Sequence, residues 1–204
     1  FFLRNLGKPV VLVGAQRSID RGSSDAAMNL VCGAVTASAN IAEVGICMHG
    51  SISDDYCNFI RGTHVRKLHT SRRDAFKPIN EAALAKVWPN GEIERTNSNC
   101  RVRDDSKKVE LDVAFEPKVA IVKAYPGSDP SVMEHLAYRG CKGIIIEASG
   151  LGHVPTNGRG SWIPAIKKLV KDGVFIGCTP QTIFGRINPD VYTNLSILYK
   201  EAGA

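Results

Sequence analysis

Lys8-Pro9-Val10-Val11-Leu12-Val13-Gly14 is a short apolar run, rich in β-branched residues, that ends on a glycine. This composition is typical of a buried parallel strand. Ser23 or Ser24 can cap a helix after it, and Asp25 suits the positive N-terminus of that helix. Val44–Met48 is a second strand-like run. A strand, a helix and a strand in this order predict an α/β layer built on a parallel sheet.

The expected helix carries apolar residues at helical spacing, which predicts a buried stripe along one face. This stripe consists of Ala27, Leu30, Val31, Ala34 and Val35. After the second strand, Asp54-Asp55 indicates a turn, and Tyr56–Ile60 is a third strand-like piece that leads into a basic loop. Because ligands of open parallel sheets bind beyond the strand ends, this loop is a candidate site.

Residues 118–204 show a regular alternation of strand-like and helix-like segments. Strands are expected at Val119–Lys123, Gly143–Glu147 and Val174–Cys178. Helices are expected at Pro130–Arg139, near Ser161–Lys171, and from Pro189 or Asp190 to Glu201. This alternation predicts βαβ units with right-handed crossovers and a parallel sheet.

The segment between these two halves has a different character. Pro89-Asn90-Gly91 indicates a turn, and residues 97–110 are polar and charged without a helical or strand period. A short strand is expected around residues 109–113. We therefore predict a first domain over residues 1–85, an inter-domain connection over residues 86–117, and a smaller C-terminal α/β domain over residues 118–204.

Composition limits the class of protein. The 204 residues have 44% apolar content and a net charge of +6, which suit a globular protein and permit, without requiring, a polyanionic partner. No apolar run approaches the ~18 residues of a membrane span. The six cysteines are scattered without metal-ligand spacing, so we expect free thiols and a cytoplasmic setting. The chain begins without methionine, and we interpret it as a fragment.

Val65-Arg66-Lys67-Leu68-His69-Thr70-Ser71-Arg72-Arg73-Asp74-Ala75-Phe76 is the basic loop with its flanking residues. A solvated surface loop is the simplest interpretation. The alternative hypothesis is that Lys67 is an active-site base, kept uncharged by burial and by the like charges of its neighbours. These neighbours are Arg66, Arg72 and Arg73.

Three blocks of the sequence resemble one known family. They are Lys8–Arg17, Ser23–Leu30 and Arg66–Phe76, and the similarity extends through most of the chain. Together they resemble the D subunits of archaeal glutamyl-tRNA(Gln) amidotransferases, which are L-asparaginase-like glutaminases. The resemblance implies an α/β fold of two asparaginase-like domains with parallel sheets. The N-terminal domain is then incomplete here, and the C-terminal domain is flavodoxin-like.

The resemblance also implies a mechanism. A threonine attacks the side-chain amide of glutamine or asparagine, ammonia leaves, and water hydrolyses the acyl-enzyme, with a second threonine, an aspartate and a lysine in support. Only the lysine maps onto this chain, at Lys67. The motifs Thr-Gly-Gly-Thr and His-Gly-Thr-Asp-Thr, which carry the threonines, do not occur in it. We therefore expect no glutaminase activity from these residues alone.

In this family the glutaminases work with amidotransferase E subunits, which bind Glu-tRNA(Gln) and use ATP and Mg²⁺. The resemblance therefore implies that this subunit has no cofactor or metal of its own and forms a homodimer within a heterotetramer. Leu68 and His69 follow the lysine where free asparaginases resemble Lys-Thr-x-Thr. This departure favours the tRNA-dependent branch.

Two other hypotheses remain open. One is a stand-alone L-asparaginase with the same chemistry and no RNA partner. The other is a non-catalytic, flavodoxin-like module whose basic loop docks an anion. Separately, Ser149-Gly150-Leu151-Gly152-His153-Val154-Pro155 imitates the start of a dinucleotide fingerprint, but Pro155 replaces its third glycine. For that loop the family resemblance implies an interface role, because the corresponding loop of asparaginase-like proteins lies near a neighbouring subunit's active site.

Overall fold

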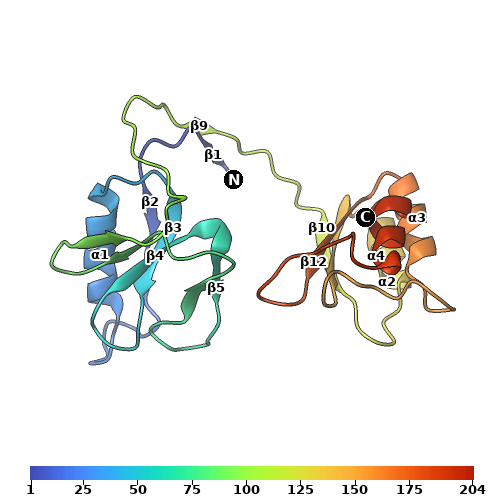
Figure 1. The fold of residues 1–204 in the computed structure, drawn as a ribbon, viewed down its shortest axis with the longest axis horizontal. Helices are drawn as coiled ribbons and strands as arrows, with labels where there is room; N and C mark the ends of the chain where they lie inside the picture. The colour runs from blue at the N-terminus through green and yellow to red at the C-terminus, as the bar shows by residue number, and fades with distance from the viewer. The chain divides into compact units, whose positions relative to one another are not determined.

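The computed structural model describes all of residues 1–204. The chain folds into two compact units, Phe1–Val113 and Ala114–Ala204, each with its own hydrophobic core (Figure 1). Both units combine helices with sheets, which confirms the α/β class predicted from the sequence. None of the helices has the length and apolar content that a membrane crossing requires.

The division between the units falls within the connection predicted over residues 86–117, but the first unit extends past residue 85. Strands β7 (Ala85–Val87) and β8 (Ile93–Arg95) form an antiparallel hairpin, closed by a bond from Trp88 N to Glu92 O at 2.9 Å. The turn that the sequence analysis assigns to the connection of residues 86–117 is therefore a hairpin turn within a sheet. The first unit continues beyond it as far as Val113.

The central sheet of the first unit has five strands in the order β2-β3-β4-β7-β8. The first three are β2 (Val10–Leu12), β3 (Val44–His49) and β4 (Cys57–Arg61). β2 and β3 are parallel, whereas the other neighbours are antiparallel. The sheet is thus mixed rather than parallel throughout. Residues 50–56, which join β3 to β4, are too few for a parallel crossover, which needs about a dozen residues.

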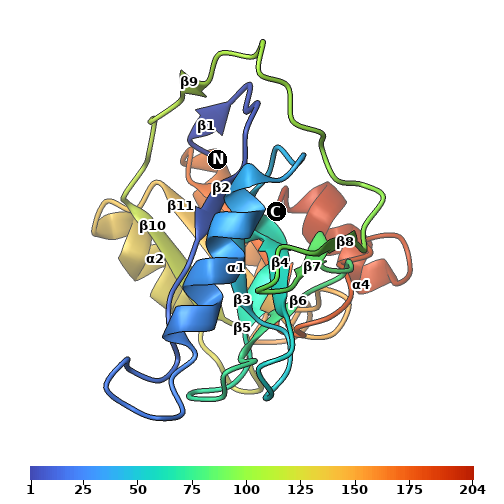
Figure 2. The same ribbon diagram turned by 90° about the vertical axis from the view of Figure 1, so that its left-hand side faces the viewer.

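Helix α1 (Ala26–Ser38) covers one face of this sheet (Figure 2). The prediction of a buried apolar stripe on this helix is wrong, since Leu30 and Val31 are exposed by 65% and 45%. The inward face of the helix instead carries small and polar residues. Gly33 allows the helix to lie close to Val13, because an added Cβ at this position would be 2.5 Å from Val13 Cγ2. Its buried residues are Asn29, Cys32, Gly33 and Thr36.

Two small sheets complete the first unit. β1 (Leu3–Arg4) pairs antiparallel with β9 (Glu110–Leu111), which confirms the short strand expected around residues 109–113. β5 (Val65–Lys67) and β6 (Phe76–Pro78) form a separate two-stranded hairpin after the 3-10 turn η1 (Gly62–His64). The basic loop is the tip of this hairpin.

The second unit is built on a parallel sheet in the order β10-β11-β12. Its strands are β10 (Val119–Lys123), β11 (Gly143–Ala148) and β12 (Phe175–Pro180), close to the three predicted from the sequence. Helices α2 (Ser131–Tyr138) and α3 (Ile163–Lys171) connect them. The chain ends in α4 (Thr193–Ser196) and the π-helical turn η2 (Ile197–Glu201). Figure 1 shows these helices on the same side of the sheet.

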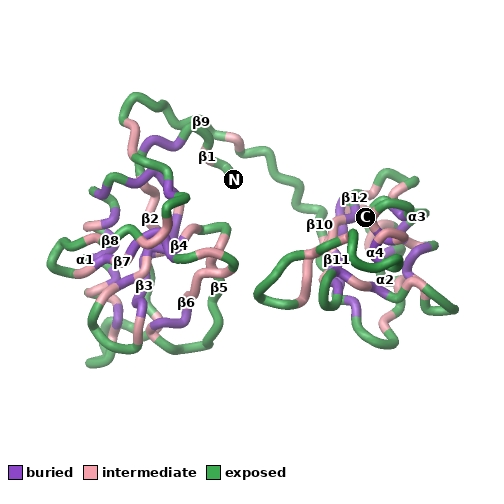
Figure 3. The backbone as a smooth tube through the Cα atoms, in the orientation of Figure 1, coloured by how far each residue is buried: buried purple, intermediate pink, exposed green.

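The core of the second unit lies between the sheet and these helices. Strand side chains alternate between faces, so Ile144 and Ile146 are buried whereas Ile121 and Phe175 are exposed by 71% and 67% on the other face. Figure 3 shows the buried backbone within each unit and the exposed residues 113–119. Other fully buried side chains are Met133, Trp162, Ile166 and Leu169.

Candidate functional site

Lys67 is the last residue of β5 and pairs with Phe76 of β6 across the hairpin. Its Nζ atom lies 5.9 Å from the centroid of the Phe76 ring. The side chain is exposed, and together with Leu68, His69 and Thr70 it lines an open depression of about 420 Å³. The predicted enclosure of Lys67 is not formed by these 204 residues, and its role as a base stays a prediction.

The arginines expected to surround the lysine do not form a cluster of free like charges. Arg66 is the preceding residue of β5, so its side chain points to the opposite face of the hairpin. Arg72 makes a paired contact with the carboxylate of Asp74, at 2.9 and 3.0 Å. Arg73 donates from Nη1 to Asp54 at 2.6 Å. Carboxylates therefore neutralise two of the three guanidinium groups.

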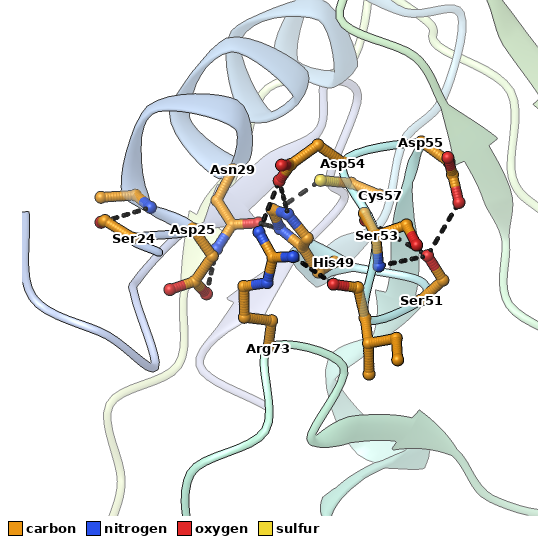
Figure 4. Close-up of polar contacts among 12 residues, drawn as sticks. Ser24, Asp25, Asn29, His49, Ser51, Ser53, Asp54, Asp55, Cys57 and Arg73 are labelled. Carbon is orange, nitrogen blue, oxygen red and sulfur yellow. Dashed lines mark hydrogen bonds and ion pairs between the residues drawn. The ribbon is translucent and has the colours of Figure 1, made fainter. Parts of the chain in front are cut away.

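A chain of polar side chains begins where β2 ends and α1 starts (Figure 4). Asp25 is fully buried and accepts hydrogen bonds from the backbone N–H groups of Gln16 and Arg17, at 3.0 Å. Asn29 donates from Nδ2 to the Asp25 carboxylate and to Gly14 O, each at 2.9 Å. Burial alone raises the pKa of Asp25, but these hydrogen bonds outweigh it and lower the pKa.

The chain continues through His49, which is fully buried at the end of β3. Its Nδ1 lies 2.6 Å from Asn29 Oδ1, and its Nε2 lies 3.1 Å from Asp54 Oδ1. The bonds that the Asn29 amide nitrogen donates fix the orientation of this amide, with its oxygen toward the ring. Asn29 Oδ1 and the Asp54 carboxylate, the two groups that face the ring, are therefore both hydrogen-bond acceptors. The hydrogen bond from His49 and the charge of Arg73 lower the pKa of Asp54. Figure 4 shows the contacts of Asp54 with both of these side chains.

Two cations join the β5/β6 hairpin to residues 50–55, the connection between β3 and β4. Arg73 donates from Nη2 to Ile52 O in addition to its carboxylate contact. Lys77 donates from Nζ to Gly50 O at 3.3 Å. The hairpin is thereby held against the loop at the carboxyl end of β3.

A second cluster fixes the tip of the hairpin itself. Asp74 is buried, and its carboxylate accepts bonds from Arg72 and from Lys77, the latter at 2.7 Å. Burial alone raises the pKa of Asp74, but the hydrogen bonds from Lys77 and Arg72 outweigh it and lower the pKa. The basic loop is therefore an ordered structure with internal ion pairs, and it differs from a freely solvated run of charges.

This network is not predicted from the sequence. There Asp25 is assigned to the helix N-terminus and Asp54 to a turn, and Asn29 and His49 have no assigned role. One signal is present in the sequence, because Asn29 interrupts an apolar segment and His49 directly follows another. Buried polar side chains need partners, so two such residues indicate a shared network.

The Ser149–Pro155 loop of the second unit does not open into a helix. Ser149 N donates to His153 O at 2.9 Å, and the His153 ring centroid lies 5.3 Å from that of Tyr192. Helix α3 begins only at Ile163, whereas a dinucleotide site needs a helix N-terminus directly after the glycines. This geometry argues against nucleotide binding. No three or more His, Cys, Asp or Glu side chains are arranged to hold a metal ion.

The chain matches two protein-family descriptions. Residues 1–100 match the N-terminal domain of asparaginase, and residues 118–204 match the glutaminase/asparaginase C-terminal domain. Among the glutamyl-tRNA(Gln) amidotransferase D subunits, that of Pyrococcus abyssi is 54% identical over 193 residues, covering 95% of this chain and 43% of that protein. Identity to the protein of the same name from Sulfolobus acidocaldarius is 46%, covering 100% and 44%. The chain thus spans less than half the length of these curated relatives.

Solved structures give the same architecture. The thermostable L-asparaginase from Thermococcus kodakarensis superposes with a TM-score of 0.86 at 25% identity, covering 100% of this chain and 57% of that one. L-asparaginase I from Vibrio cholerae gives a TM-score of 0.83 at 24% identity, covering 99% and 57%. The second similarity concerns the fold alone.

Proposed function

We infer the function from one premise, which is that this chain belongs to the glutaminase/asparaginase family. We propose that it is part of the glutaminase subunit of a tRNA-dependent amidotransferase, the enzyme that converts Glu-tRNA(Gln) to Gln-tRNA(Gln). In this proposal the subunit releases ammonia from glutamine or asparagine through an acyl-enzyme on a threonine.

Sequence identity is the observation that carries the proposal. The chain is 54% and 46% identical to two relatives named as D subunits of the amidotransferase, against 25% to a stand-alone L-asparaginase. The fold of this chain is also that of an L-asparaginase, so the fold does not separate the two functions. The difference in identity favours the tRNA-dependent branch over a free asparaginase.

We assign Lys67 the role of the base that supports the threonine nucleophile. It lies at the end of a strand, next to a hairpin tip that ion pairs hold in place. Its amine is exposed and accessible to a group that this sequence does not supply. Because the two threonine motifs do not occur in the sequence, we propose that these 204 residues alone do not hydrolyse amides.

The test of Lys67 uses the full-length protein. Lys67→Met keeps most of the side-chain volume and removes the amine, and we expect the rate of amide hydrolysis to fall by about 100-fold or more. Arg66→Met, at the neighbouring position on the other face of β5, is the matched control and should keep the rate. A full rate in Lys67→Met would return the lysine to the role of a solvated surface residue.

A second measurement separates the two enzymes. We propose that the partner is one of the amidotransferase E subunits, with ATP and Mg²⁺ used there and no cofactor in this subunit, in a cytoplasmic heterotetramer built on a homodimer. The glutaminase rate of the full-length protein should then rise when this partner and Glu-tRNA(Gln) are added. A full rate with asparagine that responds to neither would favour a stand-alone L-asparaginase. No amide hydrolysis under any of these conditions would favour a non-catalytic, anion-binding module.

A further inference from the structure

The β5/β6 hairpin depends on side chains for its position. No strand of the five-stranded sheet pairs with it, and an isolated two-stranded hairpin is only marginally stable in water. Within the hairpin, Leu68 N donates to Ala75 O at 2.8 Å and Ala75 N donates to Arg72 O at 3.1 Å. These bonds set the shape of the tip, but they do not set where the tip lies on the rest of the unit.

Arg73 supplies the attachment at the tip itself, in addition to the bond from Lys77 on β6 to Gly50 O. Its guanidinium group bonds both to the Asp54 carboxylate and to Ile52 O, so it holds two points of one loop. The side chain is 16% exposed, which makes the contact well shielded from water on the arginine side. A guanidinium group in such a paired contact fixes direction as well as distance.

Asp54 is in turn tied to the interior. Its side chain is 67% exposed, and it accepts a bond from the fully buried His49, which bonds to Asn29 on α1. The contacts therefore run from the buried face of a helix, through the end of β3, to the tip of the hairpin. Figure 4 labels the four side chains and marks the contacts that join them.

We propose that Arg73, Asp54 and His49 form a positioning bridge for Lys67. The proposal rests on the proposed glutaminase function, and none of the three residues is assigned contact with substrate. The bridge fixes the hairpin tip relative to the carboxyl end of β3, and thereby fixes the strand end that carries the lysine. A misplacement of about 1 Å in a catalytic group can cost about 100-fold in rate, so the bridge is expected to affect turnover.

The experiment compares variants of the full-length protein with its partner present. Arg73→Met removes both bonds of the guanidinium group, and Asp54→Asn removes the charge at an exposed position. Asp55→Asn is the matched control, because Asp55 is the next residue, is also exposed, and contacts only Ser51 among the hydrogen bonds described. Arg73→Lys keeps the positive charge and serves as the conservative variant.

Two readouts are needed. Hydrogen exchange without substrate follows the amides of Leu68 and Ala75, and we expect about 10-fold faster exchange in Arg73→Met and Asp54→Asn, with the strands of the second unit unchanged. Steady-state kinetics should show kcat lowered by about 10- to 100-fold in these variants, with KM changed far less. Arg73→Lys should recover part of both effects, and Asp55→Asn should show neither.

Each outcome decides the proposal. Faster exchange together with lower kcat supports the bridge as a positioning device. Unchanged exchange at Leu68 and Ala75 would overturn it, and so would faster exchange with an unchanged kcat. Failure of the proposed function is recognised separately, because the unmodified protein would then hydrolyse no amide, or Lys67→Met would keep the full rate, whatever the exchange experiment shows.

Discussion

His49 Nδ1 lies 2.6 Å from Asn29 Oδ1, which joins the buried end of β3 to helix α1. Asn29 also donates to Asp25 and Gly14 O and accepts a bond from the thiol of Cys57 at 3.4 Å. We predict that Asn29→Leu lowers the free energy of unfolding by about 3 kcal/mol, because the buried Asp25 carboxylate and the buried His49 ring both lose a partner. Denaturant unfolding of the variant and the unmodified protein measures the difference.

Leu30→Ala is the control for this prediction. Leu30 is the next residue of the same helix, and its side chain is 65% exposed. Its replacement should change the free energy of unfolding by no more than about 0.5 kcal/mol. If Asn29→Leu costs no more than this control, the polar network contributes little to stability.

Glu43 should make the stability of the first unit depend on pH. The residue is buried, and its carboxylate lies 2.7 Å from Arg61 and 2.9 Å from Arg101. Burial alone raises the pKa of Glu43, but the hydrogen bonds from Arg101 and Arg61 outweigh it and lower the pKa. The carboxylate therefore stabilises the folded state above its ordinary pKa of 4.5, and this stabilisation is lost as the pH falls through the lower pKa of the folded state.

Glu43→Gln tests this directly. The unmodified protein should lose more free energy of unfolding than the variant when the pH is lowered from about 6 to about 3. Urea unfolding at several pH values gives both curves. Two curves that stay parallel over this range would contradict the role of Glu43.

Much of the second unit can be predicted from its sequence. The run Val119–Lys123 is expected as a strand and forms β10 with the same bounds. Its residues are apolar and β-branched on both faces, as is typical of parallel strands, although Ile121 is exposed here, so the signal is local. Gly143–Ala148 follows the same rule. Where the composition of a few consecutive residues determines an element, the sequence is sufficient to predict that element.

The buried face of α1 cannot be predicted in this way. The periodic apolar residues Leu30 and Val31 are exposed, whereas Asn29 and Thr36 are buried. Asn29 is tolerated inside only because Asp25 and His49 are present to bond with it. These partners come from other segments, and helical periodicity carries no information about them.

The environment of the basic loop cannot be predicted from the sequence either, because it also depends on partners from other segments of the chain. In the sequence Arg72 and Arg73 are a pair of adjacent cations, but Asp74 and Asp54 bind them in the structure. The partner of Arg73 is 19 residues away in the chain, in a turn whose position depends on the whole β3–β4 connection. The role of Lys67 is therefore inferred from the family resemblance, whereas the contacts around it can be described only from the structure.

Gly152 is a position where the backbone requires glycine. Its φ angle is +111°, and an added Cβ would collide with the Tyr199 hydroxyl, which donates to Gly152 O at 3.0 Å. We predict that Gly152→Ala destabilises the second unit by about 2–3 kcal/mol, through backbone strain and loss of this contact. Gly158→Ala is the matched control, because Gly158 also has a positive φ, of +71°, but nothing lies near its Cβ position. Thermal unfolding should show a larger loss for Gly152→Ala, and equal losses would assign the effect to backbone conformation alone.

The cysteines should differ in reactivity according to burial. Cys32 is fully buried, and burial raises the pKa of its thiol, whereas Cys141 is half-buried. Because the thiolate is the reactive form, iodoacetamide should modify Cys141 in the folded protein and leave Cys32, Cys47 and Cys57 unmodified until denaturant is added. Mass spectrometry of the peptides gives the extent of modification at each position. If Cys32 reacted in the folded protein as fast as Cys141, the core between α1 and the first sheet would open at little cost in free energy.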